Sequence, residues 1–412
     1  MSLVNAKKIR IGGDGNPGSA TLYSGELLCT GSNPGFYVGN YSSGQGEFNQ
    51  YGGQVTTPLT IVGRGNNNTG FYRIEGGTLQ TDSLTINNTG TFVWLDDATV
   101  KNDSTIVISG GGFERGATAA WAPAEEVRLT NETDAYAYVT APTTFSGSGQ
   151  MTQNNGHVVI NDLTVTSNYD LTRGLLESQD LYNASQINIG SEGSLTAGTI
   201  HGDFNHTSGT LDAGTPNVAA VTGPANDRRV TISGAAMGET TITGDYSMGP
   251  DAVLAIDLDP SQPAGFAPSN NDPAYPSVSD KLVVEGSIDL GGTLDLRPTT
   301  TEWINGVEFD ILDFTLTPEN DADSDGELDS KFDWIILPLL GEDGFATIAG
   351  DDLMPNPEGV GEGGISTLLR WDLRDLYTTG LIRVVPEPAT WAIYGFGLIG
   401  FGWFIRRRKS QK

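Results

Sequence analysis

Hydrophobic residues along this chain alternate with polar ones in short stretches that glycine, asparagine and aspartate separate. Residues 46–61 read GEFNQYGGQVTTPLTI, and residues 70–86 read GFYRIEGGTLQTDSLTI. Alternation with a period of two residues predicts half-buried β-strands. Glycine supplies the positive φ that tight corners between such strands require. The pattern therefore predicts many short strands that turn at Gly-rich corners.

These stretches repeat every 24 to 25 residues. Gly53 and Gly77 are 24 residues apart, and Ile61 and Ile86 are 25 apart. A repeat of this length is typical of one rung of a parallel β-helix, whose rungs stack about 4.8 Å apart around an apolar interior. Propeller blades need periods of about 40 residues or more. We therefore predict an all-β fold, a right-handed parallel β-helix over residues 10–220. A sandwich of irregular strands is the alternative for parts of the chain.

The chain divides into three parts by the composition and residue pattern of its sequence. We expect β-solenoid repeats in residues 1–225 and a β-rich continuation or closing cap in residues 226–385. The second part resembles the closing portion of autotransporter-like passenger sequences, because strands such as GGTLDL recur in it. The third part is a distinct tail, residues 386–412.

The tail contains an apolar run of 17 uncharged residues, 389–405, followed by a basic cluster. As a helix the run spans about 26 Å, close to the thickness of a bilayer's hydrocarbon core. The sequence therefore predicts one C-terminal transmembrane helix that attaches the chain to a membrane. Basic flanks tend to stay cytoplasmic, so we expect the body on the opposite side. The topology residues are Arg406, Arg407, Arg408 and Lys409.

The residues before the apolar run read Val-Pro-Glu-Pro, and proline keeps such a segment extended. With the apolar run and the basic end, Pro386, Glu387 and Pro388 resemble the PEP-CTERM sorting signal. This resemblance implies an exported protein of a Gram-negative bacterium whose tail exosortase, a membrane enzyme, recognises and removes at or near the motif. An ordinary single-span anchor is the alternative. The resemblance also implies exopolysaccharide as a partner.

An exported protein of this kind should begin with a signal peptide. Residues 1–8, MSLVNAKK, contain no apolar segment of the required length. We expect the natural start to differ from the one in this sequence. A cytoplasmic protein without a signal is the alternative, and it would leave the C-terminal motif without a purpose.

Charge excludes one class of partner. The chain has 51 acidic and 22 basic residues, a formal net charge of −29. An acidic surface repels the phosphates of nucleic acid, so we expect no nucleic-acid binding. Cys29 is the single cysteine, which excludes an intrachain disulfide and a cysteine-based metal site.

One acidic segment resembles a calcium loop. Oxygen ligands at alternate positions suit Ca²⁺, and Gly326 occupies the turn position of an EF-hand-type loop. Position 12 of that pattern, however, is Phe332. The segment is a candidate calcium site, and a solvated acidic loop is the alternative. Its candidate ligands are Asp321, Asp323, Asp325, Glu327 and Asp329.

No motif for catalysis is evident, and no cofactor other than calcium is expected. Asp96, Asp97 and Asp162 are isolated acidic residues, and a fold alone is not evidence for an activity. We expect a non-enzymatic structural or adhesive protein at the cell surface or in the extracellular matrix. The alternative is a polysaccharide-binding or polysaccharide-degrading β-helix protein.

Overall fold

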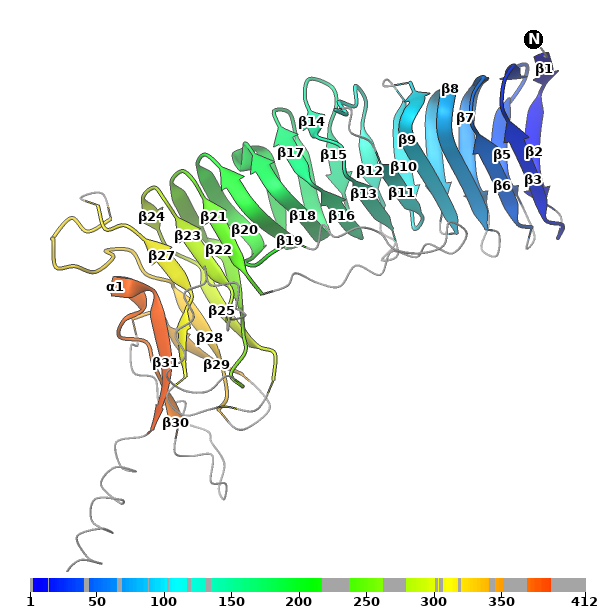
Figure 1. The fold of residues 1–412 in the computed structure, drawn as a ribbon. Helices are drawn as coiled ribbons and strands as arrows, with labels where there is room; N and C mark the ends of the chain where they lie inside the picture. The colour runs from blue at the N-terminus through cyan, green and yellow to red at the C-terminus, as the bar shows by residue number, and fades with distance from the viewer. Residues whose placement is uncertain are drawn as a thin grey trace, which may run out of the picture.

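Every second side chain of a strand points into the interior of the molecule. In β6 (Gly46–Gln50), Phe48 and Gln50 are buried, whereas Glu47 and Asn49 are half-buried on the opposite face. The same alternation recurs along the chain and produces one continuous apolar interior. The strands that enclose it stack in chain order, from β1 at one end towards β28 at the other (Figure 1).

The structure is a computed structural model that describes most of residues 3–386. Within that range it leaves out residues 14, 41–43, 65–68, 88, 102–103, 117–119, 131–134, 217–236, 262–278, 301–302, 304–306, 318–319, 341–344 and 352–368.

Three ladders of parallel strands run along the stack. The first contains β1 (Leu3–Ala6), β4 (Glu26–Cys29), β14 (Thr143–Phe145), β17 (Asp162–Val165), β21 (Glu239–Ile242), β23 (Lys281–Val284) and β27 (Leu312–Phe314). The second contains β2 (Lys8–Gly13), β5 (Gly35–Asn40), β10 (Thr105–Ser109), β12 (Val127–Leu129), β15 (Met151–Gln153) and β24 (Ile288–Asp289). The third contains β3 (Gly18–Leu22), β6, β11 (Gly112–Gly116), β13 (Tyr136–Val139), β16 (His157–Ile160), β25 (Thr293–Pro298) and β28 (Trp334–Pro338).

Some of the described strands are longer, bend around corners and join more than one ladder. These are β7 (Gln54–Arg64), β8 (Gly70–Asn87), β9 (Gly90–Val100), β18 (Tyr169–Tyr182), β19 (Ile187–His201), β20 (Phe204–Asp212) and β22 (Tyr246–Leu258). Parallel pairing in all three ladders rules out the sandwich alternative for the described strands, since sandwiches consist of antiparallel sheets. The all-β expectation agrees with this architecture.

The register corrects one detail of the predicted repeat. Ile61 pairs with Thr85, and Val62 pairs with Ile86, so the two isoleucines are not equivalent. Val62 and Ile86 are both fully buried, whereas Ile61 lies on the other face. A shift of one residue exchanges the inward and outward faces of a strand. The sequence spacing of 25 therefore missed the true period of 24 at this position.

Aromatic rings form a column inside the stack. Consecutive rings lie 4.9 to 6.3 Å apart between centroids, most of them edge to face. Such pairs stabilise a core by more than their buried area alone. The column consists of Phe36, Phe48, Tyr72, Phe92, Phe113, Trp121, Phe145 and Tyr169.

Among the described residues, a buried polar side chain at the end of a strand supports a corner between two ladders in three rungs. Gln153 donates from Nε2 to the carbonyl oxygens of Gly156 and Leu175, and its Oε1 accepts from Tyr169 of the next rung at 2.8 Å. Gln50 makes the same contacts with Gly53, Thr78 and Tyr72. The glycine three residues on has positive φ in each case, 86° at Gly156. The corner is therefore closed by hydrogen bonds between successive rungs.

His206 takes the place of glutamine at the third of these corners. Its Nε2 lies 3.1 Å from the carbonyl oxygen of Gly209, and its Nδ1 lies 3.1 Å from the hydroxyl of Tyr246. A carbonyl only accepts, so Nε2 carries the proton and Nδ1 accepts from the tyrosine. The ring is 1% exposed, and burial lowers the pKa of His206 from 6.5 to about 4.

We expect His206 to make the fold sensitive to acid. Because its pKa is lowered in the folded state, its neutral form stabilises the fold above about pH 6.5. That stability, up to about 3 kcal/mol, is lost as the pH falls towards 4. His206→Gln restores the side chain found at the other two corners and should lose less stability between about pH 7 and pH 4. Urea denaturation at each pH measures the free energy of unfolding of both proteins. If this free energy falls equally with pH in both proteins, the assignment of the acid sensitivity to His206 is contradicted.

The stack ends in antiparallel strands. β29 (Phe345–Ala349) pairs with β28 in antiparallel orientation. A separate sheet contains β26 (Glu308–Asp310), β31 (Leu381–Pro386) and β30 (Leu369–Asp372), also antiparallel. The helical turns that the structure describes are η1 (Ala184–Gln186) and α1 (Leu376–Thr379).

The predicted C-terminal transmembrane helix is contradicted. Among the residues that the structure describes, no helix is long and apolar enough to cross a membrane. Crossing takes about 20 apolar residues, whereas η1 has three residues and α1 has four. Residues 389–405, where the sequence placed the span, lie outside the described residues.

Candidate functional site

The strand β31 leads directly into the Pro-Glu-Pro motif. Pro386 is its last residue and lies opposite Leu369 of β30, so Val385 and Pro386 are extended, as the sequence predicts. On its other side, β31 pairs with β26 through Ile382. Glu387, Pro388 and the basic cluster 406–409 lie outside the described residues. The Pro-Glu-Pro motif thus begins at the last residue of a folded sheet.

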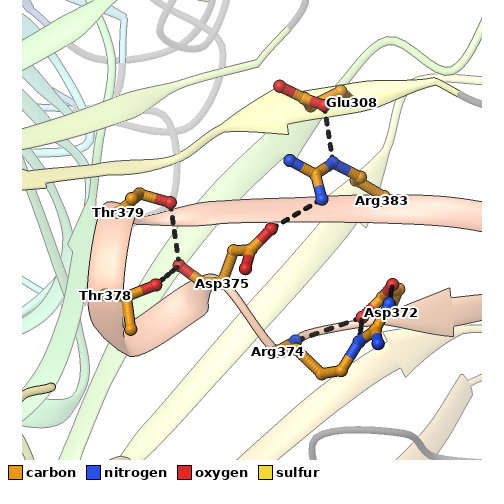
Figure 2. A network of polar contacts seen from close by, with 7 residues as sticks. All are labelled: Glu308, Asp372, Arg374, Asp375, Thr378, Thr379 and Arg383. Atoms are coloured by element: carbon orange, nitrogen blue, oxygen red, sulfur yellow. Dashed lines mark hydrogen bonds and ion pairs between the residues drawn. The ribbon is translucent and has the colours of Figure 1, made fainter.

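Arg383 fixes β31 through two carboxylates, as Figure 2 shows. Its Nε donates to Oε2 of Glu308 in β26, and its Nη1 donates to Oδ2 of Asp375, both at 2.6 Å. The hydrogen bond that Arg383 donates to Glu308 raises the pKa of Arg383 above its usual value. Charge-assisted bonds of this kind are stronger than neutral ones. Arg383 therefore joins β31 to its neighbouring strand and to the turn before it.

The turn between β30 and β31 has its own polar support (Figure 2). The carbonyl oxygen of Asp375 accepts bonds from the hydroxyls of Thr378 and Thr379. Arg374 donates from Nε to Asp372 at 2.8 Å, and this bond lowers the pKa of Asp372. These contacts explain why a helix of only one turn persists here.

Buried contacts attach this sheet to the last rungs of the stack. Trp371 is fully buried, and its indole N–H donates to the carbonyl of Pro338 in β28. Gly380 has φ of 73°, and a Cβ there would lie 1.8 Å from the carbonyl oxygen of Leu312. Only glycine fits such a close approach of two backbones. The segment before the motif is therefore held against the end of the solenoid.

The acidic loop brings together three of its five predicted calcium ligands. Oxygens of Asp321, Asp323 and Asp325 lie within 4.8 Å of one another. Asp329 instead accepts from the backbone N–H of Ala322 at 2.7 Å, and Glu327 lies 3.7 Å from Lys331. Asp321 and Asp323 also accept from the backbone N–H of Asp325. The loop's calcium binding remains a prediction from the sequence.

A second acidic group was not predicted. Oxygens of Asp212, Asp257 and Asp280 lie within 4.8 Å of one another, although the residues come from different rungs. Burial raises the pKa of Asp212 to about 6 and that of Asp280 to about 8. The recurrence of Thr-Leu-Asp at 210–212 and 293–295 was a signal for Asp212 alone, because Asp212 and Asp295 occupy the same position of the rung.

The remaining sequence candidates lie apart from both acidic groups. Asp162 is half-buried in β17 and is paired in register with Asp180. Asp96 and Asp97 lie in β9, and the structure does not describe their side chains. His157 lies 2.7 Å from Glu177, and His201 stacks on Tyr182 with 4.1 Å between ring centroids.

Residues 384–408 match the family model of the PEP-CTERM protein-sorting motif. No curated protein and no solved structure matches the chain. The motif indicates an exported protein that exosortase sorts to the cell envelope or surface. The matched residues begin at Val384 inside β31, so the sorting motif starts within the folded sheet.

Proposed function

We propose that this chain is a non-enzymatic structural or adhesive protein of the cell surface or extracellular matrix, released from its tail by exosortase. The observation that carries the proposal is the direct connection of a long solenoid to a sorting motif. A stack of parallel ladders presents an extended surface, and its strong negative charge favours solubility after export. Such a protein acts through a large surface of repeated rungs.

Polysaccharide binding is the second candidate function, and an exposed pair of tyrosines favours it. Tyr23 and Tyr51 are 73% and 45% exposed, and they stack with 5.4 Å between ring centroids. Each follows a strand of the third ladder directly, since Leu22 pairs with Gln50. Exposed aromatic faces are unusual on an acidic, polar surface and offer apolar contact to sugar rings. Binding here would need no catalytic group.

One experiment tests the proposal and separates the two candidates. A strain that lacks this protein is complemented with the wild-type chain, with Tyr23→Ala/Tyr51→Ala, or with the control Tyr182→Ala. Wild type should restore the protein to the surface or matrix fraction and restore attachment of cells to a surface. If sugars are bound, the double variant should lose at least about half of its retention on matrix polysaccharide, because two exposed rings are removed. A wild-type chain found only inside the cell would refute the structural or adhesive proposal.

A further inference from the structure

Three carboxylates converge on the outer face of the solenoid where its later rungs meet. Asp212 ends β20, Asp257 lies in β22, and Asp280 directly precedes β23. One oxygen of each lies within 4.8 Å of an oxygen of the others. Two oxygens on opposite sides of one Ca²⁺ are separated by about 5 Å, since each Ca–O bond is about 2.3 to 2.6 Å. The spacing therefore suits a single ion between the three side chains.

The arrangement of Asp280 is held by the backbone. Its Oδ1 accepts from the N–H of Gly238 and its Oδ2 accepts from the N–H of Asp257, both at 2.9 Å. A carboxylate has about four lone-pair positions, so two remain available to a cation. Asp280 is only 2% exposed, and its position does not depend on solvent. The site is thus organised without an ion.

The charge around the three carboxylates is incompletely balanced. Arg297 contacts Asp295 at 2.8 Å and Asp212 at 3.7 Å. This guanidinium interacts with Asp212, Asp257 and Asp295, and Asp280 interacts with Asp212 and Asp257 in turn. Like charges in a partly buried site repel strongly. A doubly charged cation would relieve this repulsion.

A buried hydroxyl beside the cluster has no hydrogen-bond partner. Thr196 is fully buried, and its Oγ1 makes no hydrogen bond. Its neighbour Leu195 pairs with Leu211, which places Thr196 beside Asp212 on the same outward face. On its other side it pairs with Glu177, a carboxylate that interacts electrostatically with Asp212. A buried hydroxyl without a partner is costly, and an oxygen-ligated ion or its bound water would supply one.

We propose that Asp212, Asp257 and Asp280 bind one Ca²⁺ ion, with the hydroxyl of Thr196 as a further oxygen donor, directly or through water. Hard oxygen ligands from a partly preformed site suit Ca²⁺, whereas Mg²⁺ demands near-octahedral geometry. The ion joins the ends of two segments, because residues 212 and 238 flank one and residues 257 and 280 flank the other. Closing such segments stabilises the fold.

Calcium titration of the purified 412-residue chain tests this site. After removal of metal by EDTA, about 1 to 5 mM CaCl₂ should raise the melting temperature, and calorimetry gives the affinity. Asp212→Asn/Asp257→Asn keeps the side-chain shape and should weaken this affinity at least about tenfold. The matched control Asp321→Asn/Asp323→Asn alters the other acidic loop and should retain the response of this site. An equal MgCl₂ concentration should produce a smaller shift.

A second variant keeps the test independent of folding defects. Thr196→Val preserves shape and removes only the hydroxyl, so the metal-free protein should be as stable as wild type or more so. Its calcium affinity should fall several-fold, whereas Thr196→Ser should restore it. No calcium response in the wild type would overturn the proposal. An unchanged response in Asp212→Asn/Asp257→Asn, or its loss only in the Asp321→Asn/Asp323→Asn control, would also overturn it.

Discussion

Substitution of Glu387 or Pro388 by alanine is expected to leave the exported chain at full length. Residues 384–408 match the sorting motif, so these substitutions change the sequence that exosortase recognises. Proline also disfavours helical backbone in the residue before it, and alanine at position 388 removes that restriction. Because Pro386 still belongs to β31, the recognised segment lies immediately beside a folded sheet.

Mass spectrometry of the C-terminus measures this result. The chain is expressed with an export signal in the native host, with and without exosortase. Wild type should lose its tail only when exosortase is present, and both variants should keep it in either strain. Glu362→Ala, an acidic substitution outside the matched residues, is the control and should be processed normally. Processing of all proteins in the exosortase-null strain would show that another enzyme acts on the tail.

Gln153→Leu is expected to lower the free energy of unfolding by about 3 to 5 kcal/mol. The substitution removes three hydrogen bonds: two that the carbonyls of Gly156 and Leu175 accept, and one that the hydroxyl of Tyr169 donates. The carbonyl of Gly156 still accepts from the backbone N–H of Leu175, whereas the buried hydroxyl of Tyr169 loses its partner. The unpartnered hydroxyl costs about 1 to 3 kcal/mol, and each of the other two lost bonds costs about 1 kcal/mol. Leucine cannot bond to any of them. The corner should open and destabilise the rungs on both sides.

Urea denaturation of the single and double variants measures the effect. Tyr169→Phe alone should cost about 1 kcal/mol, and the double variant should cost less than the two single changes together, since they share a bond. Gln80→Leu, at an exposed glutamine of β8, is the matched control and should change stability by less than about 0.5 kcal/mol. Equal effects of Gln153→Leu and Gln80→Leu would show that the buried amide does not support the corner.

The buried glutamines also show where sequence reasoning stopped. Gln153 lies among polar residues, in MTQNNGH, and would be taken for an exposed turn residue. Its partner Tyr169 is 16 residues away and becomes a neighbour only through the parallel pairing of β15 with β18. Local composition contains no information about that register. The same holds for His206, whose partner Tyr246 is 40 residues away.

At the C-terminus the predicted membrane helix is contradicted and the predicted extended segment is found, and both outcomes have a physical explanation. The apolar run 389–405 satisfies the length criterion for a membrane helix, but the helices that the structure describes are short turns. Hydropathy describes the free energy that a segment would gain on transfer from water to lipid. It does not predict the conformation of the segment outside a membrane. The extended conformation at Val385 and Pro386 was predictable, because proline restricts its own φ and the residue before it.

The sequence by itself determined the all-β character, the spacing of the repeat and the sorting motif. These features depend on local patterns, namely alternation, glycine at corners and a short linear motif. Only the tertiary structure decided which residues meet across rungs. Asp212, Asp257 and Asp280 are separated by long insertions, and the pairing of Val62 with Ile86 differs by one residue from the apparent repeat. Rung register depends on the packing of each coil against the last, and one residue of slip exchanges the two faces of a strand.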